Sequence, residues 1–100
     1  MFVTREDRDL SVKCGDIFKI EVESNPSTGY KWHLLFFDED ILKLLSNKFV
    51  PDMTNHIGSQ GIEQFNFEAI KEGRTSIKIA YKRAWEKQTA KLNEFFVNVI

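Results

Sequence analysis

The sequence contains little cysteine, little proline and no long apolar run. Its 100 residues include one cysteine, Cys14, two prolines and five glycines. A single cysteine cannot form an internal disulfide, so the fold does not depend on one. No apolar run approaches the roughly 20 residues that a transmembrane helix needs. We therefore expect neither a disulfide framework nor a membrane-spanning helix.

An excess of charge of one sign is also absent. The 14 lysines and arginines are balanced by 15 aspartates and glutamates, which gives a formal net charge of -1. Nucleic-acid-binding proteins gain affinity mainly from basic side chains on phosphates, so this balance argues against a nucleic-acid-binding surface. The first nine residues lack a basic stretch followed by an apolar segment. We therefore expect a cytoplasmic protein, with a vesicular or secreted mature form left open.

The rest of the composition fits one small folded domain. Apolar residues make up 42% and charged residues 29%, which is close to the globular average. Nine phenylalanines, two tyrosines and two tryptophans can fill one core. The length and this composition predict a single domain over residues 1–100.

Alternating apolar and polar residues predict strands along most of the chain. A period of two runs through three segments, which are residues 18–23, 64–69 and 76–82. Such a period places one face in a core and the other in water. Residues 10–12 fit a short first strand, and residues 95–100 are β-branched and aromatic without a clear inward face. Residues 30–37 are apolar on both faces towards their end, so we expect a central strand there.

The segment Asp38–Val50 fits two interpretations. Its apolar residues between 41 and 45 fit a helical stripe that Asp38 could cap. Two short β segments fit as well. We favour β structure because every neighbouring segment is β and Pro51 ends the run.

Seven strands at roughly ten-residue spacing predict an all-β fold, an immunoglobulin-like antiparallel β-sandwich. Short connections then alternate with long ones, and the long ones are residues 24–29, 51–61 and 83–93. When strands alternate in direction, alternate connections emerge at the same end of the sandwich. We therefore expect the three long loops to lie together, where long loops on a rigid scaffold commonly carry recognition.

The first long loop has a stiff tip. Pro26 fixes its own φ and pushes Asn25 into an extended conformation, while Gly29 permits a positive φ. The same residue types also make ordinary turns. The candidate binding residues of this loop are Asn25, Pro26, Ser27, Thr28, Gly29 and Tyr30.

The other two loops each add a short candidate motif. The second loop ends in Gly58, Ser59, Gln60 and Gly61. Its two glycines either let the backbone approach a partner closely or simply make the loop flexible. The third loop begins with Arg83, Ala84 and Trp85. Tryptophan and arginine are the residues that most often carry interface energy, although the indole could instead fold back onto the edge of the sandwich.

The order of these motifs resembles the chagasin family of cysteine peptidase inhibitors. The family signatures are Asn-Pro-Thr-Thr-Gly-Tyr/Phe, Gly-x-Gly-Gly and Arg-Pro-Trp/Phe, and this chain has similar motifs at residues 25–30, 58–61 and 83–85. The similarity covers essentially the whole chain and extends to Trp32, Glu63, Phe65 and Tyr81. Three positions depart from the signatures, namely Ser27 for threonine, Gln60 for glycine and Ala84 for proline.

The resemblance implies an immunoglobulin-like sandwich that inhibits papain-like cysteine proteases reversibly and without a covalent bond. It implies that the first loop enters the middle of the active-site cleft, near the catalytic thiolate and histidine. The loop at residues 58–61 would lie along one side through its backbone, and Arg83 and Trp85 would grip the other. We expect a one-to-one complex and no cofactor. A monomer is expected because no coiled-coil pattern is present.

An enzyme fits the residues less well than an inhibitor does. Cys14 with His33 or His56 is the possible thiol–imidazole pair, but the predicted turn that contains Cys14 lies opposite the loop of His56. We expect the small side chain of Cys14 to be partly buried. We expect His33 to have a structural role or to be half-exposed. Two histidines and one cysteine do not make a usual zinc site. The acidic run Asp38–Asp40 fits a solvated turn better than a calcium site, so we expect no metal.

A second binding function remains open from the sequence. An immunoglobulin-like module could hold a carbohydrate or another protein with the same loop end, and Trp85 and Tyr30 could stack on a sugar ring. An aromatic or amide-rich platform on a strand face is not evident, which counts against a carbohydrate.

Overall fold

The computed structural model describes residues 2–4, 9–25, 28–51 and 61–100. Pro26, Ser27 and the candidate residues 58–60 lie outside these ranges. The strands of the described part are β1 (Phe2–Thr4), β2 (Asp9–Val12), β3 (Ile17–Ser24), β4 (Tyr30–Phe36), β5 (Leu42–Pro51), β6 (Gly61–Ala69), β7 (Gly73–Arg83) and β8 (Lys91–Val99).

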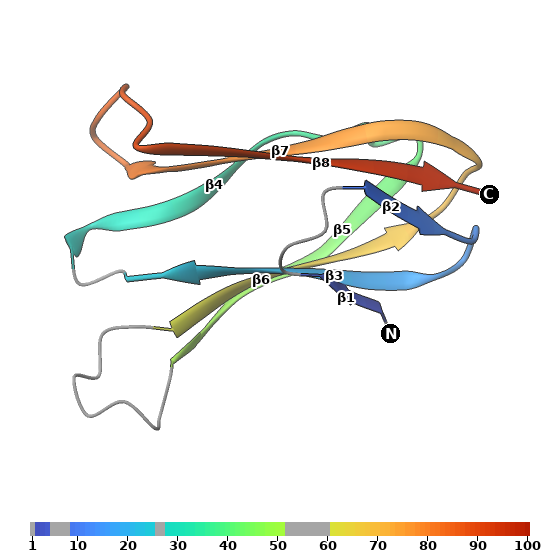
Figure 1. The fold of residues 1–100 in the computed structure, drawn as a ribbon, viewed down its shortest axis with the longest axis horizontal. Helices are drawn as coiled ribbons and strands as arrows, with labels where there is room; N and C mark the ends of the chain where they lie inside the picture. Colours follow the sequence, from blue (N-terminus) through green and yellow to red (C-terminus); the bar gives the residue numbers. More distant parts are fainter. Residues whose placement is uncertain (1, 5–8, 26–27, 52–60) are drawn as a thin grey trace.

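The strands form two four-stranded sheets that pack face to face (Figure 1). One sheet has the order β1-β3-β6-β5 and the other the order β2-β8-β7-β4. The predicted all-β sandwich is therefore confirmed, and its seven predicted strands are β2 to β8. Strand β1 was not predicted. It pairs in parallel with β3, and β2 pairs in parallel with β8, whereas the other pairings are antiparallel.

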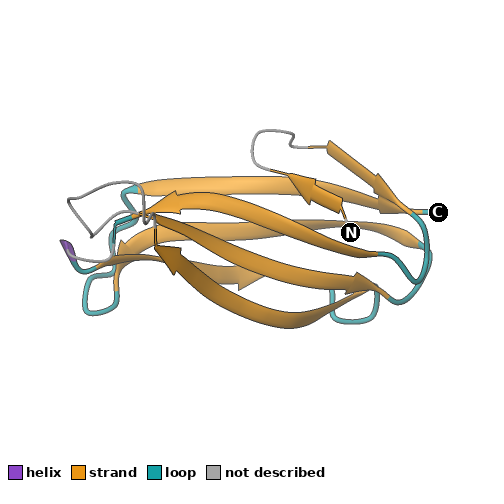
Figure 2. Ribbon diagram, turned by 90° about the horizontal axis from the view of Figure 1, so that it is seen from below, coloured by secondary structure: helices purple, strands orange, loops and turns teal. Residues whose placement is uncertain are grey.

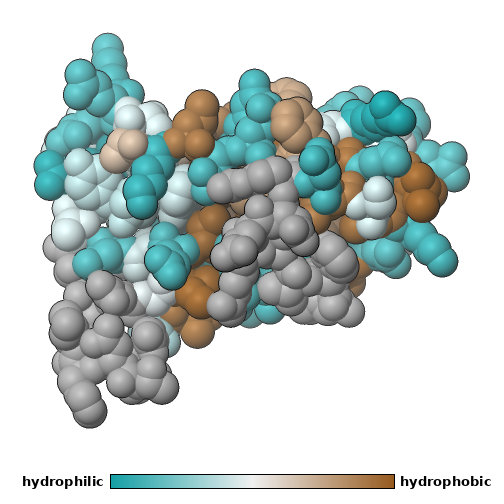
Figure 3. Space-filling view, in the orientation of Figure 1, coloured by the Kyte–Doolittle hydropathy of each residue, from teal (hydrophilic) through white to brown (hydrophobic). Residues whose placement is uncertain are grey.

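The core lies between the sheets and is formed by the inward face of each alternating strand. The fully buried large side chains include Phe18, Ile20, Phe65, Phe67, Ile77, Ile79 and Phe95. Each fully buried side chain of this size contributes roughly 1.5–3 kcal/mol. The inward face of the last strand, which the sequence left ambiguous, is now fixed because Val97 and Val99 are buried and Phe96 is exposed. On the face shown in Figure 3, hydrophobic residues form separate patches among hydrophilic ones.

Residues 42–51 form a strand, so the β interpretation of this segment is confirmed. Strand β5 pairs with β6 along its whole length, from Leu42 opposite Ala69 to Pro51 opposite Gly61. A bulge between Leu44 and Ser46 shifts the register. Such a bulge interrupts the period of two, which is why the apolar spacing around residue 45 also fitted a helix.

The prediction that residues 30–37 form a central strand is wrong. Among the described strands, β4 lies at the edge of its sheet and pairs only with β7. The apolar run reflects a bulge between Leu34 and Phe36, since Leu35 and Phe36 are exposed while Leu34 packs against the core. Bulges are common on edge strands because they disturb the open row of backbone groups.

The connections alternate between the two ends of the sandwich, as predicted. We call one end the loop end: there β3, β5 and β7 end and β4, β6 and β8 begin, all on the left in Figure 1. The opposite turn end holds the connections at residues 13–16, 37–41 and 70–72. Strands run the length of the molecule between the two ends (Figure 2). The third long loop is shorter than predicted, because β8 already begins at Lys91. In the described part, no helix is long and apolar enough to cross a membrane.

Candidate functional site

The described part of the first loop is closed by local hydrogen bonds. The backbone N–H of Thr28 and its hydroxyl both donate to the carbonyl of Asn25, at 3.3 and 2.8 Å. Gly29 follows with φ of 82°, in the left-handed region that favours glycine. A threonine that bonds three residues back and a glycine at positive φ make a tight turn, so the loop returns directly into β4.

Aromatic side chains hold the base of this loop. The Tyr81 hydroxyl accepts the backbone N–H of Asn25 at 3.1 Å. The Tyr81 ring lies between Tyr30 and Trp32, with centroid distances of 5.3 and 5.0 Å. The indole N–H of Trp32 donates to the carbonyl of Glu23 at 2.8 Å. Strand β7 thus fixes both the start and the end of the first loop through one tyrosine.

Glu63 connects the two sheets beneath the same loop. Its side chain on β6 is only 2% exposed, and one carboxylate oxygen, Oε1, accepts the hydroxyl of Ser24 at 2.9 Å and the backbone N–H of Trp32 at 3.0 Å. Ser24 ends β3 and Trp32 lies in β4, so Glu63 ties together the strands that flank the first loop. The N–H of Trp32 belongs to an edge strand and would otherwise be buried without a partner.

Arg83 joins the third loop to the first. Its Nε donates to the carbonyl of Thr28 at 3.2 Å, and its guanidinium carbon lies 4.6 Å from the centre of the Tyr30 ring. The Nη1 group pairs with Glu86 at 3.0 Å. A planar guanidinium can stack on an aromatic ring and donate hydrogen bonds at its edge at the same time. Arg83 therefore fixes the position of two neighbouring loops.

Trp85 stands at the surface of the third loop and leans on the first. Its side chain is 73% exposed. A Cβ added to Gly29 would come within 2.9 Å of the indole Cη2 atom. The guanidinium of Arg83 lies 5.9 Å from the indole centre. The indole is therefore not folded into the sandwich: it rests on Gly29 and keeps most of its surface available to a partner.

The described part of the second-loop motif is its last residue, Gly61, which pairs with Ser24 at the loop end. Gly61 begins β6, and a Cβ there would collide with the carbonyl oxygen of Val50 and the ring of Phe49. Only glycine allows this close approach of the two strands at the loop end. Gly58, Ser59 and Gln60 lie outside the described residues, so their part in the site stays a prediction.

The structure thus brings together most of the described candidate residues. Those that meet at the loop end through direct contacts are Asn25, Thr28, Gly29, Tyr30, Arg83 and Trp85. Ala84 is exposed between two of them. The supporting roles of Tyr81 and Glu63 were not predicted. The sequence held one signal for Glu63, because this residue continues the alternating row of Phe65 and Phe67 that points into the core. A carboxylate in such a row is buried and needs a hydrogen-bond partner there.

The described residues considered for catalysis or metal binding lie away from these loops, and His56 lies outside the described residues. Cys14 is exposed at the turn end, so the expectation that it is partly buried is wrong. It sits in a tight turn, in which the backbone N–H groups of Cys14 and Gly15 donate to the carbonyls of Ile100 and Ala69. His33 is half-buried, as expected. Among the residues that the structure describes, no group of His, Cys, Asp and Glu could hold a metal ion.

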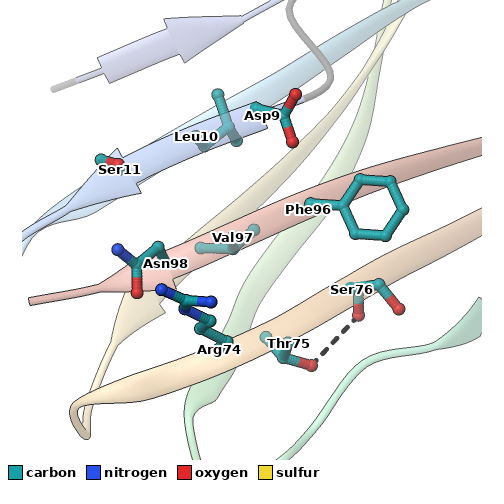
Figure 4. A pocket seen from close by; sticks show the side chains of 9 residues that line it. All are labelled: Asp9, Leu10, Ser11, Arg74, Thr75, Ser76, Phe96, Val97 and Asn98. Atoms are coloured by element: carbon teal, nitrogen blue, oxygen red, sulfur yellow. Dashed lines mark hydrogen bonds between the residues drawn. The ribbon is translucent and has the colours of Figure 1, made fainter.

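A shallow groove also lies towards the turn end, away from the candidate site. It runs over β2, β8 and β7 (Figure 4), and Asp9, Arg74 and Phe96 are among the residues that line it. Thr75 donates a hydrogen bond to the carbonyl of Ser76 there, and its hydroxyl accepts the backbone N–H of Asp38. These bonds stabilise the end of the sandwich opposite the three long loops.

Comparisons with known proteins identify related chains. The model of the chagasin family of peptidase inhibitors I42 matches residues 11–99. Amoebiasin-2 of Entamoeba histolytica is 32% identical over 92 residues, which span 91% of this chain and 75% of that protein.

Solved structures share the fold. The cysteine protease inhibitor EhICP2 of Entamoeba histolytica superposes with a TM-score of 0.85 at 26% identity, over 99% of this chain and 95% of that chain. PbICP-C, solved in complex with falcipain-2, has a TM-score of 0.62 at 22% identity, over 98% of this chain and 89% of that chain. At that lower identity the likeness concerns the fold alone. With nearly the whole chain matched by the family model, the protein belongs to the chagasin family of peptidase inhibitors.

Proposed function

We propose that this protein is a reversible, tight-binding inhibitor of papain-like cysteine proteases that blocks the active-site cleft with its loop end. The observation that carries the proposal is the contact of the first and third loops, in which Trp85 rests on Gly29 and Arg83 bonds to Thr28. Family membership supports inhibition as the function, and the structural relative EhICP2 is a cysteine protease inhibitor. The fold relative PbICP-C was captured on falcipain-2.

Preorganisation explains how so small a surface could bind tightly. Each side chain or loop that becomes ordered on binding costs free energy, roughly 0.5–1.5 kcal/mol per long side chain. Arg83 is already held by Thr28, Tyr30 and Glu86 before any partner arrives. Trp85 likewise has a support beneath it. Such a surface loses little conformational freedom in the complex.

Inhibition would be occlusion of the cleft and not chemistry on the protein itself. A protease cleaves a peptide only when the carbonyl lies in near-attack geometry to its nucleophile. The tight turn closed by Thr28 and Gly29 bends the chain away from the extended form of a substrate. The first loop can therefore fill the cleft without offering a carbonyl for attack. By this mechanism the protein is not an enzyme and needs no cofactor.

Titration of papain with the purified protein tests the proposal. We expect stoichiometric, one-to-one loss of activity that dilution or competing substrate reverses. Trypsin, a serine protease, is the control and should keep its activity. Papain that stays fully active at micromolar inhibitor would contradict the proposal.

A separate assay distinguishes occlusion from covalent trapping. The inhibitor should bind a papain variant whose catalytic cysteine is replaced by alanine, with nearly the affinity it has for the active enzyme. Mass spectrometry should also find the inhibitor intact after long incubation with active papain. Cleavage between Pro26 and Gly29 at the rate of a substrate would refute occlusion.

A carbohydrate-binding function is not favoured by the family match. It would require Tyr30 and Trp85 to present open faces to a sugar, yet Tyr30 is stacked between Tyr81 and Arg83. Thermal shift with common mono- and oligosaccharides is the direct comparison. We expect no sugar to raise the melting temperature.

A further inference from the structure

Two lysines face each other at the loop end of the sheet β2-β8-β7-β4. Lys31 on β4 and Lys82 on β7 are direct partners in the antiparallel register. They lie beside the first and third loops, one residue from Tyr30 and Arg83. Directly opposed like charges destabilise a sheet. Within the described ranges neither lysine has an ion pair, although acidic side chains pair with Lys78 and Arg83 nearby.

Further basic residues continue from this pair around the third loop. Lys87 is exposed in the loop, and Lys91 is exposed at the start of β8, with its amine 5.9 Å from the centre of the Tyr81 ring. We call Lys31, Lys82, Lys87 and Lys91 the basic rim. Arg83 is not included because Glu86 pairs with its guanidinium. Lys82 and Lys87 flank Trp85 in the sequence, Lys91 begins the next strand, and Lys31 is paired with Lys82.

The opposite end of the sandwich has the opposite sign. The connections at the turn end contain Asp16, Asp38, Glu39, Asp40 and Glu72, against Lys13 and Lys71. Acidic and basic residues nearly cancel over the whole chain, and the described charges nearest the loop end are mostly basic, with Lys31, Lys82, Arg83, Lys87 and Lys91 against Glu23 and Glu86. A molecule polarised in this way is turned by the field of a charged partner before contact.

Resting on the proposed function, we propose that the basic rim docks against an acidic surface beside the cleft of the target protease. The rim speeds association and selects proteases whose cleft border is negative. The like-charge pair of Lys31 and Lys82 has a cost in the free inhibitor that a negative partner offsets. Charges at the border of an interface act mainly on the association rate and its salt dependence, while the central contacts set the dissociation rate.

The test compares the association rate constants of matched variants by stopped-flow. The probe is a papain-like protease with a net negative charge at the assay pH, and a basic papain-like protease is used in parallel. For the double variant Lys31→Glu/Lys82→Glu we expect association with the acidic protease to slow about tenfold at low ionic strength, with a much smaller change in dissociation. The control variant Lys13→Glu/Lys71→Glu makes the same change of charge at the turn end and should slow association less than about twofold.

The single variant Lys31→Glu separates docking from folding. It replaces the like-charge pair by an opposite-charge pair, so its melting temperature should rise by about 2 °C while association with the acidic protease slows. A general defect of the fold would instead lower both the melting temperature and the association rate. Equal association rates for the loop-end and turn-end variants, or native association with the acidic protease that does not depend on salt, would overturn the proposal. Those results leave inhibition itself intact, whereas a native protein that inhibits neither protease refutes the proposed function.

Discussion

The indole of Trp85 rests against Gly29, so that a single added carbon on the glycine would come within 2.9 Å of the ring. The two residues are far apart in the sequence, and each belongs to a different loop. Their contact makes one surface out of two loops. It also explains why an exposed tryptophan has a defined place on this molecule.

Gly29→Ala should weaken both stability and inhibition. The φ of 82° puts an alanine into the left-handed region, which costs roughly 1–2 kcal/mol. The new methyl group also pushes the indole away, so we expect the inhibition constant for papain to rise about tenfold or more. Gly15→Ala is the matched control, since Gly15 has φ of 97° with no atom within 4 Å of the added carbon. Gly15→Ala should lower stability to a similar degree and leave inhibition unchanged.

Trp85→Ala should affect binding much more than folding. The side chain is largely exposed, so the free energy of unfolding should change by less than about 0.5 kcal/mol. Loss of a central aromatic anchor should cost about 2 kcal/mol of binding or more, which enzyme kinetics with papain measures. Phe96→Ala removes another exposed aromatic ring, at the turn end, and should leave the inhibition constant as it is. An unchanged constant for the Trp85 variant would remove this residue from the site.

Arg83→Lys tests whether geometry or charge matters at the junction of the loops. Lysine keeps the positive charge but loses the stacking on Tyr30 and the directed bond to Thr28. We expect a loss of about 1 kcal/mol of binding, close to a fivefold higher inhibition constant. Arg74→Lys at the turn end is the control. A native-like constant for Arg83→Lys would mean that charge alone suffices.

Glu63→Ala should destabilise the fold by about 2–4 kcal/mol, because it leaves the buried N–H of Trp32 without an acceptor and opens a cavity. Glu63→Gln retains an oxygen at the Oε1 position and should lose less than half as much. Urea unfolding measures both variants. Two variants of equal stability would show that the bonds to Ser24 and Trp32 do not hold the strands.

The fold was largely predictable, because every second residue of a strand points into the core and this gives the sequence a clear period of two. The alternation through Phe18 and Ile20, and again through Phe65 and Phe67, fixed the strands and their buried faces. Where a bulge breaks the period, as at Leu35, the sequence suggested a central strand although β4 lies at an edge. Strand β1 is too short to show a period.

That the described candidate residues of the first and third loops lie at one end was predictable, but their contacts were not. Because alternate connections emerge at the same end of a sandwich, the order of the strands indicated that the first and third loops share an end. The motifs within these loops indicated which side chains to examine. That Trp85 leans on Gly29, and that Glu63 bonds to Trp32, depends on distances between residues remote in the chain. Period and composition contain no information on such distances.

Hydrogen–deuterium exchange of the inhibitor, free and bound to papain whose catalytic cysteine is replaced by alanine, tests the central claim most directly. If the first and third loops enter the cleft together, the amides of Thr28, Gly29 and residues 84–86 should become protected in the complex. The turn-end amides of residues 13–16 and 38–41 should exchange as they do in the free protein. Protection confined to the turn end, or to only one of the two loops, would contradict the account.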